Sequence, residues 1–363
     1  MSFHLFGLGT ALPAARVTQD EGLAVARALG GAELLDAPWL PSVYAHCGVL
    51  TRHQVVGRPL IDDLLNGTQL SGSVFLPDGT EGPTTAERMA LYAETAPPLA
   101  VNASAIALQE SGFAPDSITH LVSVSCTGFV SPGVDLAVIR ALGLRPTIER
   151  THVGFMGCHG ALNGLRVANA YCKADPKARV LLCAVELCSI HYHYGWQPDK
   201  VVANALFADG AAALVGSAKP IPSGWHVAAT GSCLIPDSAK MMGWTIGNFG
   251  FEMTLSRKIP DLIAANLRPW LTEWLGQQGL SMETVGSWAV HPGGPKILTA
   301  VEEGLDLPRD ALATSRAVYA ECGNMSSPTV LFILDRMRMA NAPRPCVMLG
   351  FGPGLVAEAV LWR

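Results

Sequence analysis

The sequence predicts an α/β fold built from two similar halves. Short apolar runs of β-rich composition alternate with longer segments of helical periodicity, which is typical of layered α/β proteins. Of the 363 residues, 49% are hydrophobic and only 15% are charged, so much of the surface must be buried in a thick fold or against another subunit. A polar, turn-forming stretch, SAKPIPSG at 217–224, marks a boundary. We therefore expect one half over residues 1–220 and the other over 221–363.

The individual elements follow from this alternation. The expected strands are Leu5–Gly9, Leu121–Ser125, Val180–Val185, Ala211–Val215, Val227–Gly231, Trp288–Val290, Cys346–Gly350 and Val356–Leu361. The expected helices are Asp20–Leu29, Ala86–Ser111, Gly133–Leu142, Gly160–Cys172, Arg257–Gln277, Lys296–Glu303 and Ser327–Arg338. The hydropathy of the chain is thus spread over many short buried elements.

Two glycine-framed turns make the halves look like distant copies of each other. Gly157-Cys158-His159-Gly160 begins an apolar helix in the first half, and Gly323-Asn324-Met325-Ser326 begins another in the second. Each helix is followed by a glycine-containing turn and an apolar strand, at 209–215 and at 352–356. Duplicated halves of this kind would bring the two helix starts together at a pseudo-twofold axis.

Bulk properties exclude several classes of protein. A formal net charge of −5 and a pI near 6.1 leave no basic field for nucleic acid. The nine cysteines form no CxxC pair in a chain too long for a disulfide scaffold, so we expect reduced thiols. The segment MSFHLFGLGTALPAARV lacks a signal-peptide pattern, and no apolar run reaches the roughly 18–20 residues that span a bilayer. These features predict a soluble, cytoplasmic protein.

Cys158 is the strongest candidate for a nucleophile. A thiol in the first turn of a helix lies at the positive end of the helix dipole, which favours the thiolate. The glycines on either side leave room for a substrate to approach. The alternative is a buried structural cysteine, the common state of free cysteine in proteins.

His291 and Asn324 are candidate partners for that thiol. His291 follows a β-run and precedes a Pro/Gly turn, a position where α/β enzymes often carry active-site residues. A packed histidine that binds a loop is the alternative, and for Asn324 the alternative is an ordinary helix N-cap. A thiol, an imidazole and an amide, each on a glycine-framed turn, form a stronger pattern than any one alone.

Four segments carry a resemblance to a known family: GFMGCHGALNGLR (154–166), VHPGGPKIL (290–298), CGNMSSPTVLFILDRMR (322–338) and GFGPGLVAE (350–358). They resemble the signatures of type III polyketide synthases, the chalcone and stilbene synthase family of thiolase-fold enzymes. The match runs in order from about residue 5 to residue 360. Within the family, residues 242–244 and 250–256 are more similar to bacterial alkylpyrone and alkylresorcinol synthases than to plant chalcone synthases.

The resemblance implies a thiolase-like, five-layered αβαβα fold of two pseudo-symmetric halves, and a mechanism without metal or cofactor. Cys158 would take the acyl group of an acyl-CoA starter, helped by His291 as an imidazolium partner that lowers the pKa of the thiol. Malonyl-CoA would then lose carbon dioxide, and its enolate would attack the acyl-cysteine repeatedly before cyclisation. The side chains of His291 and Asn324 would donate to the enolate oxygen, and one such donor is worth about 3–4 kcal/mol.

The residues expected to line the substrate pocket partly depart from the plant pattern. Phe207 matches the phenylalanine at the junction of CoA tunnel and cavity, and Ser326 belongs to the Asn324 motif. Trp244 replaces a glycine and Met253 a second phenylalanine. The remaining departures are Cys126, Thr127, Cys188 and His191. A tryptophan that narrows the aromatic-starter pocket and a flexible methionine lead us to expect a fatty acyl starter rather than a coumaroyl one.

The CoA phosphates require cations at the tunnel mouth. Arg52 aligns with the basic stretch of the family, and Lys296 follows the His291 turn, so both are candidates. The resemblance also implies a homodimer, which agrees with the low charged fraction.

Two other readings of the sequence remain open. The first is a single-round ketoacyl synthase of the type that initiates fatty-acid synthesis from malonyl carrier protein, which also uses Cys, His and Asn. The Gly-Phe-Gly-Pro-Gly motif and Phe207 favour the iterative, CoA-dependent family instead. The second is a zinc-binding protein that uses Cys183, Cys188, His191 and His193, although alternate side chains on a strand diverge.

Overall fold

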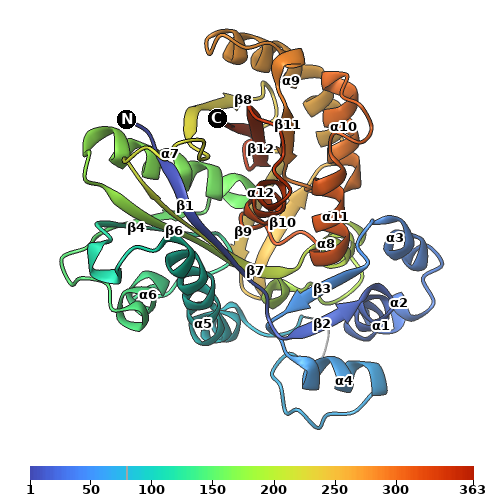
Figure 1. Cartoon of the computed structure of the whole chain (residues 1–363). Coiled ribbons are helices and arrows are strands. Elements are labelled where there is room, and N and C mark those ends of the chain that lie inside the picture. The colour runs from blue at the N-terminus through green and yellow to red at the C-terminus, as the bar shows by residue number, and fades with distance from the viewer. Residues whose placement is uncertain (79–80) are drawn as a thin grey trace.

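Two sheets of matching topology frame the molecule in its computed structural model, which describes residues 1–78 and 81–363 (Figure 1). The first sheet has the order β1 (His4–Ala11), β7 (Asp209–Ser217), β6 (Arg179–Leu187), β4 (His120–Ser125) and β5 (Glu149–Gly154). The second has the order β11 (Ser287–Val290), β12 (Cys346–Gly352), β13 (Val356–Trp362) and β8 (Val227–Leu234).

The pairing directions repeat from one sheet to the other. In the first sheet β4 and β6 are parallel, whereas β6–β7 and β7–β1 are antiparallel. In the second sheet β11 and β12 are parallel, whereas β12–β13 and β13–β8 are antiparallel. Four strands of each half therefore correspond one to one, and β5 extends the first sheet alone. The predicted pair of pseudo-symmetric halves is confirmed.

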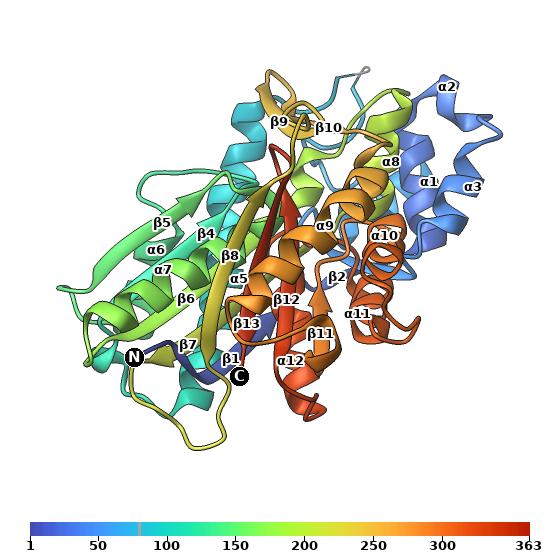
Figure 2. The ribbon, with the colours of Figure 1, turned by 90° about the horizontal axis from the view of Figure 1, so that it is seen from above.

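Helices lie on both faces of each sheet, which produces five layers (Figures 1 and 2). The outer face of the first sheet packs on α5 (Thr85–Ser111) and α6 (Val134–Leu142). The space between the sheets holds α7 (Gly160–Ala174) and α12 (Thr329–Met339). The outer face of the second sheet packs on α9 (Ile259–Gly276) and α10 (Pro295–Leu305). The predicted αβαβα order is thus observed.

The strand β12 shows why the sheet residues form unbroken apolar runs. Cys346 and Met348 belong to the central core with α7 and α12, whereas Val347 and Leu349 belong to the outer core with α9 and α10. Because side chains alternate along a strand, a sheet covered on both faces requires apolar residues at every position.

All the predicted strands and helices are present, with ends that shift by a few residues. The elements that the sequence did not predict are β2 (Ala15–Thr18), α2 (Ala32–Leu35), α3 (Leu40–His46), β3 (Thr51–Gln54), α4 (Arg58–Asn66), β5, α8 (Pro198–Leu206), β9 (Met242–Gly247), β10 (Gly250–Leu255) and α11 (Ala313–Cys322). Most are short or polar; β5, for example, reads ERTHVG and is mostly exposed or half-buried at its sheet edge.

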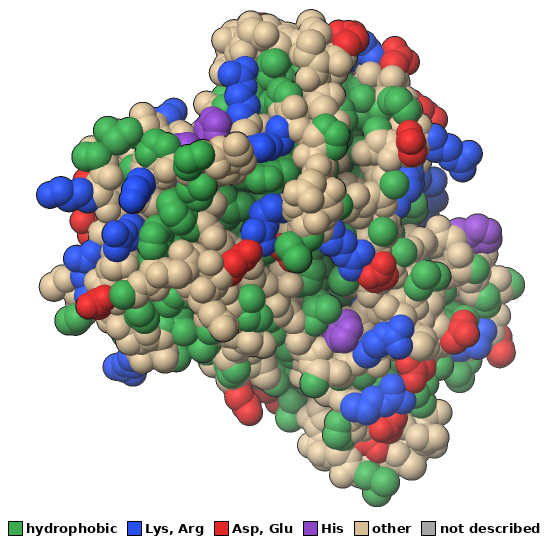
Figure 3. Space-filling view, in the orientation of Figure 1, with side chains coloured by type: hydrophobic (Ala, Val, Ile, Leu, Met, Phe, Trp, Pro, Cys, Tyr) green, Lys and Arg blue, Asp and Glu red, His purple; other side chains and the backbone are tan. Residues whose placement is uncertain are grey.

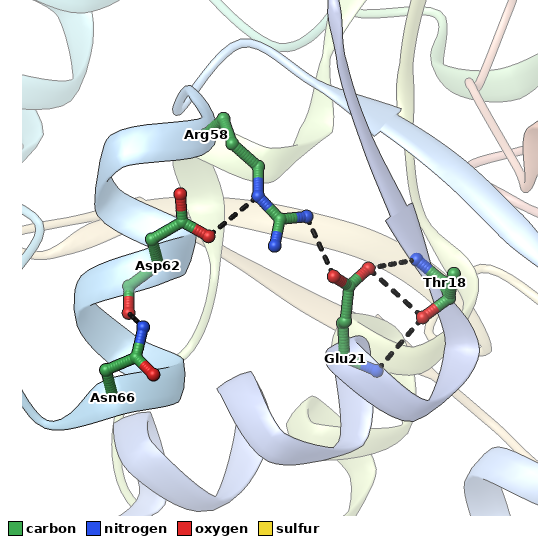
Figure 4. A network of polar contacts seen from close by, with 5 residues as sticks. All are labelled: Thr18, Glu21, Arg58, Asp62 and Asn66. Carbon is green, nitrogen blue, oxygen red and sulfur yellow. Dashed lines mark hydrogen bonds and ion pairs between the residues drawn. The ribbon is translucent and has the colours of Figure 1, made fainter.

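A polar network ties α4 to the start of α1 (Gln19–Gly30), as Figure 4 shows. Thr18 caps α1 in a reciprocal capping box with Glu21. Arg58 Nη1 donates to Glu21 Oε1 at 2.8 Å, and Arg58 Nε donates to Asp62 Oδ1 at 2.8 Å. The network lies near the surface, so its contribution to stability is small.

The surface and the helices carry two further features. None of the described helices combines the length and the hydropathy that crossing a bilayer requires. On the face shown in Figure 3, acidic and basic side chains are interspersed with apolar ones rather than gathered by sign.

Candidate active site

One cavity brings together all the residues that the sequence predicted for catalysis and for the substrate pocket. Its walls come from both halves, and it encloses about 1000 Å³ outside protein atoms, part of it open to solvent. The predicted residues that line it are Cys126, Thr127, Cys158, Cys188, His191, Phe207, Trp244, Met253, His291, Asn324 and Ser326. The pseudo-symmetric fold accounts for this convergence, because it places the ends of both central helices at the same point.

Cys158 lies in a short 3₁₀ turn (Gly157–His159) that runs directly into α7. Gly157 has φ = 67°, and a Cβ on it would come within 2.6 Å of Pro353 Cδ in the other half. Only glycine meets both requirements at low cost. The turn therefore holds the thiol against the cavity, where Cys158 is half-buried.

His291 continues from the end of β11, where its backbone N–H donates to Leu349 O at 2.8 Å. Its side chain is 1% exposed, and neither ring nitrogen has a hydrogen-bond partner among the described residues. Both nitrogens are therefore available for the thiol, for a ligand or for water.

Burial shifts the pKa values of Cys158 and His291 in opposite directions. Burial raises the pKa of Cys158 to about 11, although hydrogen bonds from Ser326 and Asn324 lower it. Burial lowers the pKa of His291 to about 3, and a positive charge on the neighbouring His159 would add to the effect. Burial thus favours a neutral thiol beside a neutral imidazole, and the role of His291 as an imidazolium partner of Cys158 stays a prediction. A neutral thiol and a neutral imidazole can still exchange one proton without changing the net charge of the site.

Asn324 follows Gly323, whose φ of 71° matches that of Gly157. The side-chain oxygen Oδ1 accepts from the backbone N–H of Ser326 at 2.8 Å, and Nδ2 donates to Gly293 O at a long 3.4 Å. The N-cap of α12 is Pro328, so Asn324 does not cap that helix. Its amide N–H₂ group lines the cavity beside Cys158, where it can donate to a ligand that reaches the thiol.

The sequence did not lead us to Glu186, a fully buried carboxylate behind the cavity wall. Its oxygens accept from the backbone N–H groups of Cys126 and Thr127 at 2.9 and 3.0 Å, and from the hydroxyls of Thr127 and Ser327 at 2.8 Å. Burial raises its pKa, and these hydrogen bonds oppose that rise. The one signal in the sequence was an acidic residue near the end of the apolar strand β6.

An aromatic stack forms one wall of the cavity. The Trp244 and Phe251 rings lie 5.1 Å apart at 6°, and the Phe251 and His191 rings lie 4.2 Å apart at 16°. The ring of His191 is locked in place, because Nε2 lies 2.6 Å from Thr127 O and Nδ1 accepts from the Phe251 N–H at 3.1 Å. Burial lowers the pKa of His191 to about 4, so this ring is neutral. The stack is a rigid wall.

The sequence did not single out Phe251, although β10 shows the signal. Phe251, Met253 and Leu255 all line the cavity at a spacing of two, which is one face of a strand. Trp244 pairs directly with Met253 across the β9–β10 hairpin. Recognising this hairpin would have placed all four side chains on one face.

The other pocket residues occupy distinct places on the wall. Cys126 Sγ lies 3.4 Å from Ser326 Oγ, so these two side chains link the two halves beside the nucleophile. Phe207 forms a backbone bridge with Asn324 and is 8% exposed. Cys188 is half-buried at the same cavity.

The structure contradicts the prediction that Arg52 contacts CoA at the tunnel mouth. Arg52 is fully buried, and its guanidinium donates to the backbone oxygens of Asn204 at 2.6 Å and Ala205 at 2.8 Å. These two residues directly precede Leu206 and Phe207, and Phe207 lines the cavity. Arg52 therefore supports the cavity wall from the protein interior. Lys296 is exposed on the first turn of α10 and remains a candidate.

The residues of the alternative zinc site point in different directions. Cys183 faces α5, where its thiol approaches Ala100 O at 3.7 Å, whereas Cys188 and His191 line the cavity. No group of three or more metal-binding side chains lies together within residues 1–78 and 81–363.

Comparison with known proteins assigns this fold and cavity to a class. Over its full length the chain superposes on the crystal structure of PKS-I from the brown alga Ectocarpus siliculosus, with a TM-score of 0.93, 32% identity and 99% of that chain covered. It also superposes on the C-terminal type III polyketide synthase domain of Steely1 from Dictyostelium, with a TM-score of 0.87, 26% identity and 99% of that chain covered. The fold and the site thus define a condensing enzyme of the polyketide synthase type.

The sequence comparisons narrow this class. The N-terminal domain model of the chalcone and stilbene synthases matches residues 77–220, and the C-terminal domain model matches residues 226–363. The chain belongs to the chalcone and stilbene synthase family and is a type III polyketide synthase.

Two bacterial relatives illustrate the family. The chain is 36% identical over 291 residues to the alpha-pyrone synthesis polyketide synthase-like Pks18 of Mycobacterium tuberculosis, with 78% of this chain and 74% of the relative covered. It is 38% identical over 272 residues to the 1,3,6,8-tetrahydroxynaphthalene synthase of Streptomyces peucetius, with 73% and 72% covered.

Proposed function

We propose that this enzyme loads a fatty acyl group from CoA onto Cys158, extends it repeatedly with malonyl-CoA, and cyclises the product to a pyrone or a resorcinol. The observation that carries this proposal is the meeting of one thiol, one imidazole and one amide in a largely apolar cavity. An apolar cavity suits a hydrocarbon chain, and the three polar groups suffice for acyl transfer and decarboxylation.

The loading step begins with a proton transfer from Cys158 to His291. The thiolate attacks the thioester carbonyl and the CoA thiolate leaves, so the acyl group becomes a cysteine thioester. Malonyl-CoA then loses carbon dioxide, and the N–H groups of His291 and Asn324 stabilise the enolate oxygen. The enolate carbon attacks the acyl-cysteine carbonyl and expels the Cys158 thiolate, so the chain is two carbons longer and is now carried by CoA. Transfer of this chain back to Cys158, with release of that CoA, allows the next extension.

The aromatic stack supports a flexible starter. The stacked rings of Trp244, Phe251 and His191 form a wall that would limit the space for a planar coumaroyl group. Met253 and Leu255, which line the cavity further along β10, have flexible side chains that can adapt to a hydrocarbon chain. The printed names of the relatives, an alpha-pyrone enzyme and a tetrahydroxynaphthalene synthase, support ring formation from polyketide chains.

A substrate panel tests the proposal. Acyl-CoA thioesters of C8–C18 chain length and coumaroyl-CoA are each incubated with malonyl-CoA, and products are identified by mass spectrometry with Cys158→Ala as the control. We expect pyrones or resorcinols from the fatty acyl starters. Preferred turnover of coumaroyl-CoA would refute the starter, and product from Cys158→Ala would refute the mechanism.

Malonyl-CoA alone separates this function from that of a single-round ketoacyl synthase. Triketide or longer pyrones indicate iteration with CoA substrates. Activity only with malonyl carrier protein, and one extension per starter, would favour the alternative.

The assembly and the location belong to the same proposal. We propose a homodimer because Phe129 and Phe155, whose rings lie 6.0 Å apart, are 50% and 47% exposed near the edge strand β5. We place the enzyme in the cytoplasm because all nine cysteines are free. Lys296 is the proposed contact for CoA phosphate, and Lys296→Glu should raise the KM for malonyl-CoA.

A further inference from the structure

One face of α7 carries a polar chain that begins at the buried His159, directly after Cys158, and ends at the half-buried Arg166. His159 precedes the helix, and Asn163 and Arg166 follow on the same face at helical spacing. Asn163 Nδ2 donates to Glu358 Oε1 at 3.1 Å, and Arg166 pairs with the other oxygen of that carboxylate. An amide thus links a charged carboxylate of β13 to the residue beside the nucleophile.

The chain determines which nitrogen of His159 carries a hydrogen. Nδ1 of His159 lies 2.7 Å from Asn163 Oδ1. Because the amide nitrogen of Asn163 faces the Glu358 carboxylate, its oxygen accepts from His159, and the hydrogen lies on Nδ1. Nε2 then presents a lone pair. This atom is buried without a hydrogen-bond partner among the described residues, on a side chain that is 3% exposed. An unpaired buried acceptor of this kind calls for an explanation.

The rings of His159 and His291 lie on the same side of the second sheet. His291 donates its backbone N–H to Leu349 O, so it lies beside Gly350. The residues two positions before His291 and Gly350 both face the central core, and side chains alternate along strands. A Cβ on Gly350 would come within 3.2 Å of His159 Cβ, and a Cβ on Gly352 within 2.5 Å of His159 Nε2. The two glycines make room for the His159 ring.

We propose that His159 is a positioning residue whose Nε2 accepts a hydrogen bond, directly or through one water, from His291 once that ring is protonated. The inference rests on the proposed roles of Cys158 and His291. When the S–H bond of Cys158 breaks, its proton moves to one ring nitrogen of His291, and the imidazolium then carries two N–H groups. One faces the thiolate, and the other needs the acceptor that His159 supplies. Burial lowers the pKa of His159, which keeps Nε2 unprotonated.

The charged groups around this chain act on the ionisation of Cys158 in different ways. Glu358 on β13 lies at its far end, and Arg166 on α7 pairs with the outer oxygen of that carboxylate. The charge of Glu186 on β6 raises the pKa of the Cys158 thiol and so opposes its ionisation. A neutral His159, whose buried Nε2 has an unused lone pair, would offset part of that cost.

Alkylation of Cys158 by iodoacetamide tests the proposal without any acyl substrate. The rate is followed against pH in the full-length enzyme by mass spectrometry of the Cys158 peptide, because only the thiolate reacts. His159→Phe removes both ring nitrogens, whereas His159→Gln places an amide oxygen near the position of Nε2. We expect the rate at pH 7 to fall about tenfold in His159→Phe, equivalent to a rise of one pKa unit, and to recover mostly in His159→Gln.

A matched control on the same helix separates this role from packing. Asn169 is buried on α7 and accepts from the backbone N–H of Phe3, far from the cavity, so Asn169→Ala should lower the melting temperature and leave the pH profile unchanged. Superimposable profiles of the wild type and His159→Phe would overturn the proposal. Should His159→Phe fail to fold, His159→Asn decides, because it keeps a donor for Asn163 but lacks the distal acceptor. A failed substrate panel would leave the alkylation result intact, so the two failures are distinguishable.

Discussion

The turn before Cys158 and the turn before Asn324 both contain a glycine with positive φ, but they differ in their surroundings. In each, a glycine with φ near 70° directly precedes the functional residue, at Gly157 and at Gly323. Each glycine also contacts the opposite half: Pro353 approaches the first, and residues 206–208 approach the second. The duplication thus supplied two equivalent supports at one cavity.

The two functional side chains are held differently on these supports. Cys158 is half-buried, and its side chain faces the cavity. Asn324 is 1% exposed. Its backbone N–H donates to Leu206 O, and its backbone oxygen accepts from the Ala208 N–H, both at 2.9 Å. A nucleophile must carry a growing chain, whereas an enolate donor must stay fixed. The difference in burial follows this division of work.

Removing the thiol should have the largest effect. Cys158→Ala should reduce product formation by more than about 10³-fold, because no other group on either turn forms the acyl intermediate. The enzyme should remain folded, since the side chain is only half-buried. Intact-protein mass spectrometry with an acyl-CoA should show no acyl adduct. The matched variants Cys126→Ala and Cys188→Ala, at the other two cavity thiols, should still form the acyl adduct. Loss of the adduct in either variant would show that Cys158 is not the only thiol needed for loading.

Removing the donor on the other turn should leave loading intact. Asn324→Asp keeps the oxygen that accepts from Ser326 N–H but loses the amide donor. Decarboxylation of malonyl-CoA should fall about 10²–10³-fold, the usual cost of one oxyanion donor. Carbon dioxide release measures this step, and acyl-enzyme formation measures loading. Equal losses in both steps would show that the two turns are not specialised.

The brace behind the Asn324 turn should matter for stability rather than for CoA binding. Arg52→Met leaves the buried oxygens of Asn204 and Ala205 without their donor and should cost about 3 kcal/mol in urea unfolding. Arg58→Met removes an exposed arginine of similar size and should cost no more than about 1 kcal/mol. A folded Arg52→Met enzyme with a raised KM for CoA thioesters would restore the tunnel-mouth assignment.

The sequence predicted the layers well because two-sided burial leaves a direct signal. Strands such as β12 are apolar at every position, and the glycine turns frame Cys158 and Asn324 visibly. Arg52 was misplaced because a motif alignment does not reveal burial, and a cation held by backbone oxygens looks the same in sequence as a solvated one. Phe251 and Glu186 were missed because their roles depend on strand pairing and on distant donors.

The glycines themselves provide a direct comparison of the two supports. A Cβ at Gly157 would lie 2.6 Å from Pro353, and a Cβ at Gly323 would lie 2.9 Å from Ala208. Each Gly→Ala variant should lose about 1–3 kcal/mol through backbone strain and crowding. Gly67→Ala isolates the strain, because that residue has φ = 65° and no atom within 4 Å of its Cβ position, so it should lose only about 1 kcal/mol. Equal losses at all three sites would show that the contacts between halves contribute nothing.

The pH dependence of the free energy of unfolding should show the smallest effect, and it should distinguish His291 in one half from Glu186 in the other. Burial lowers the pKa of His291 from 6.5 to about 3, so between these values the unfolded chain binds more protons, and stability is lost as the pH falls through this window. Burial raises the pKa of Glu186 above 4.5, so the folded chain binds more protons there, and stability is lost as the pH rises above 4.5. Each group changes the free energy of unfolding by at most about 1.4 kcal/mol per pH unit.

Single variants separate these opposing contributions. His291→Gln should flatten the acid side of the stability curve relative to the wild type, and Glu186→Gln should remove the decline above pH 4.5. Urea unfolding at pH intervals between 4 and 8 measures both, with the exposed Glu303→Gln as a control for charge alone. His291 and Glu186 lie in different halves but near the same cavity. A ligand that binds in this cavity and keeps both groups away from water should therefore leave both pH slopes of the free energy of unfolding unchanged. If the two substitutions changed the pH slope of stability in the same direction, burial would not be shifting the pKa values of His291 and Glu186 in opposite directions.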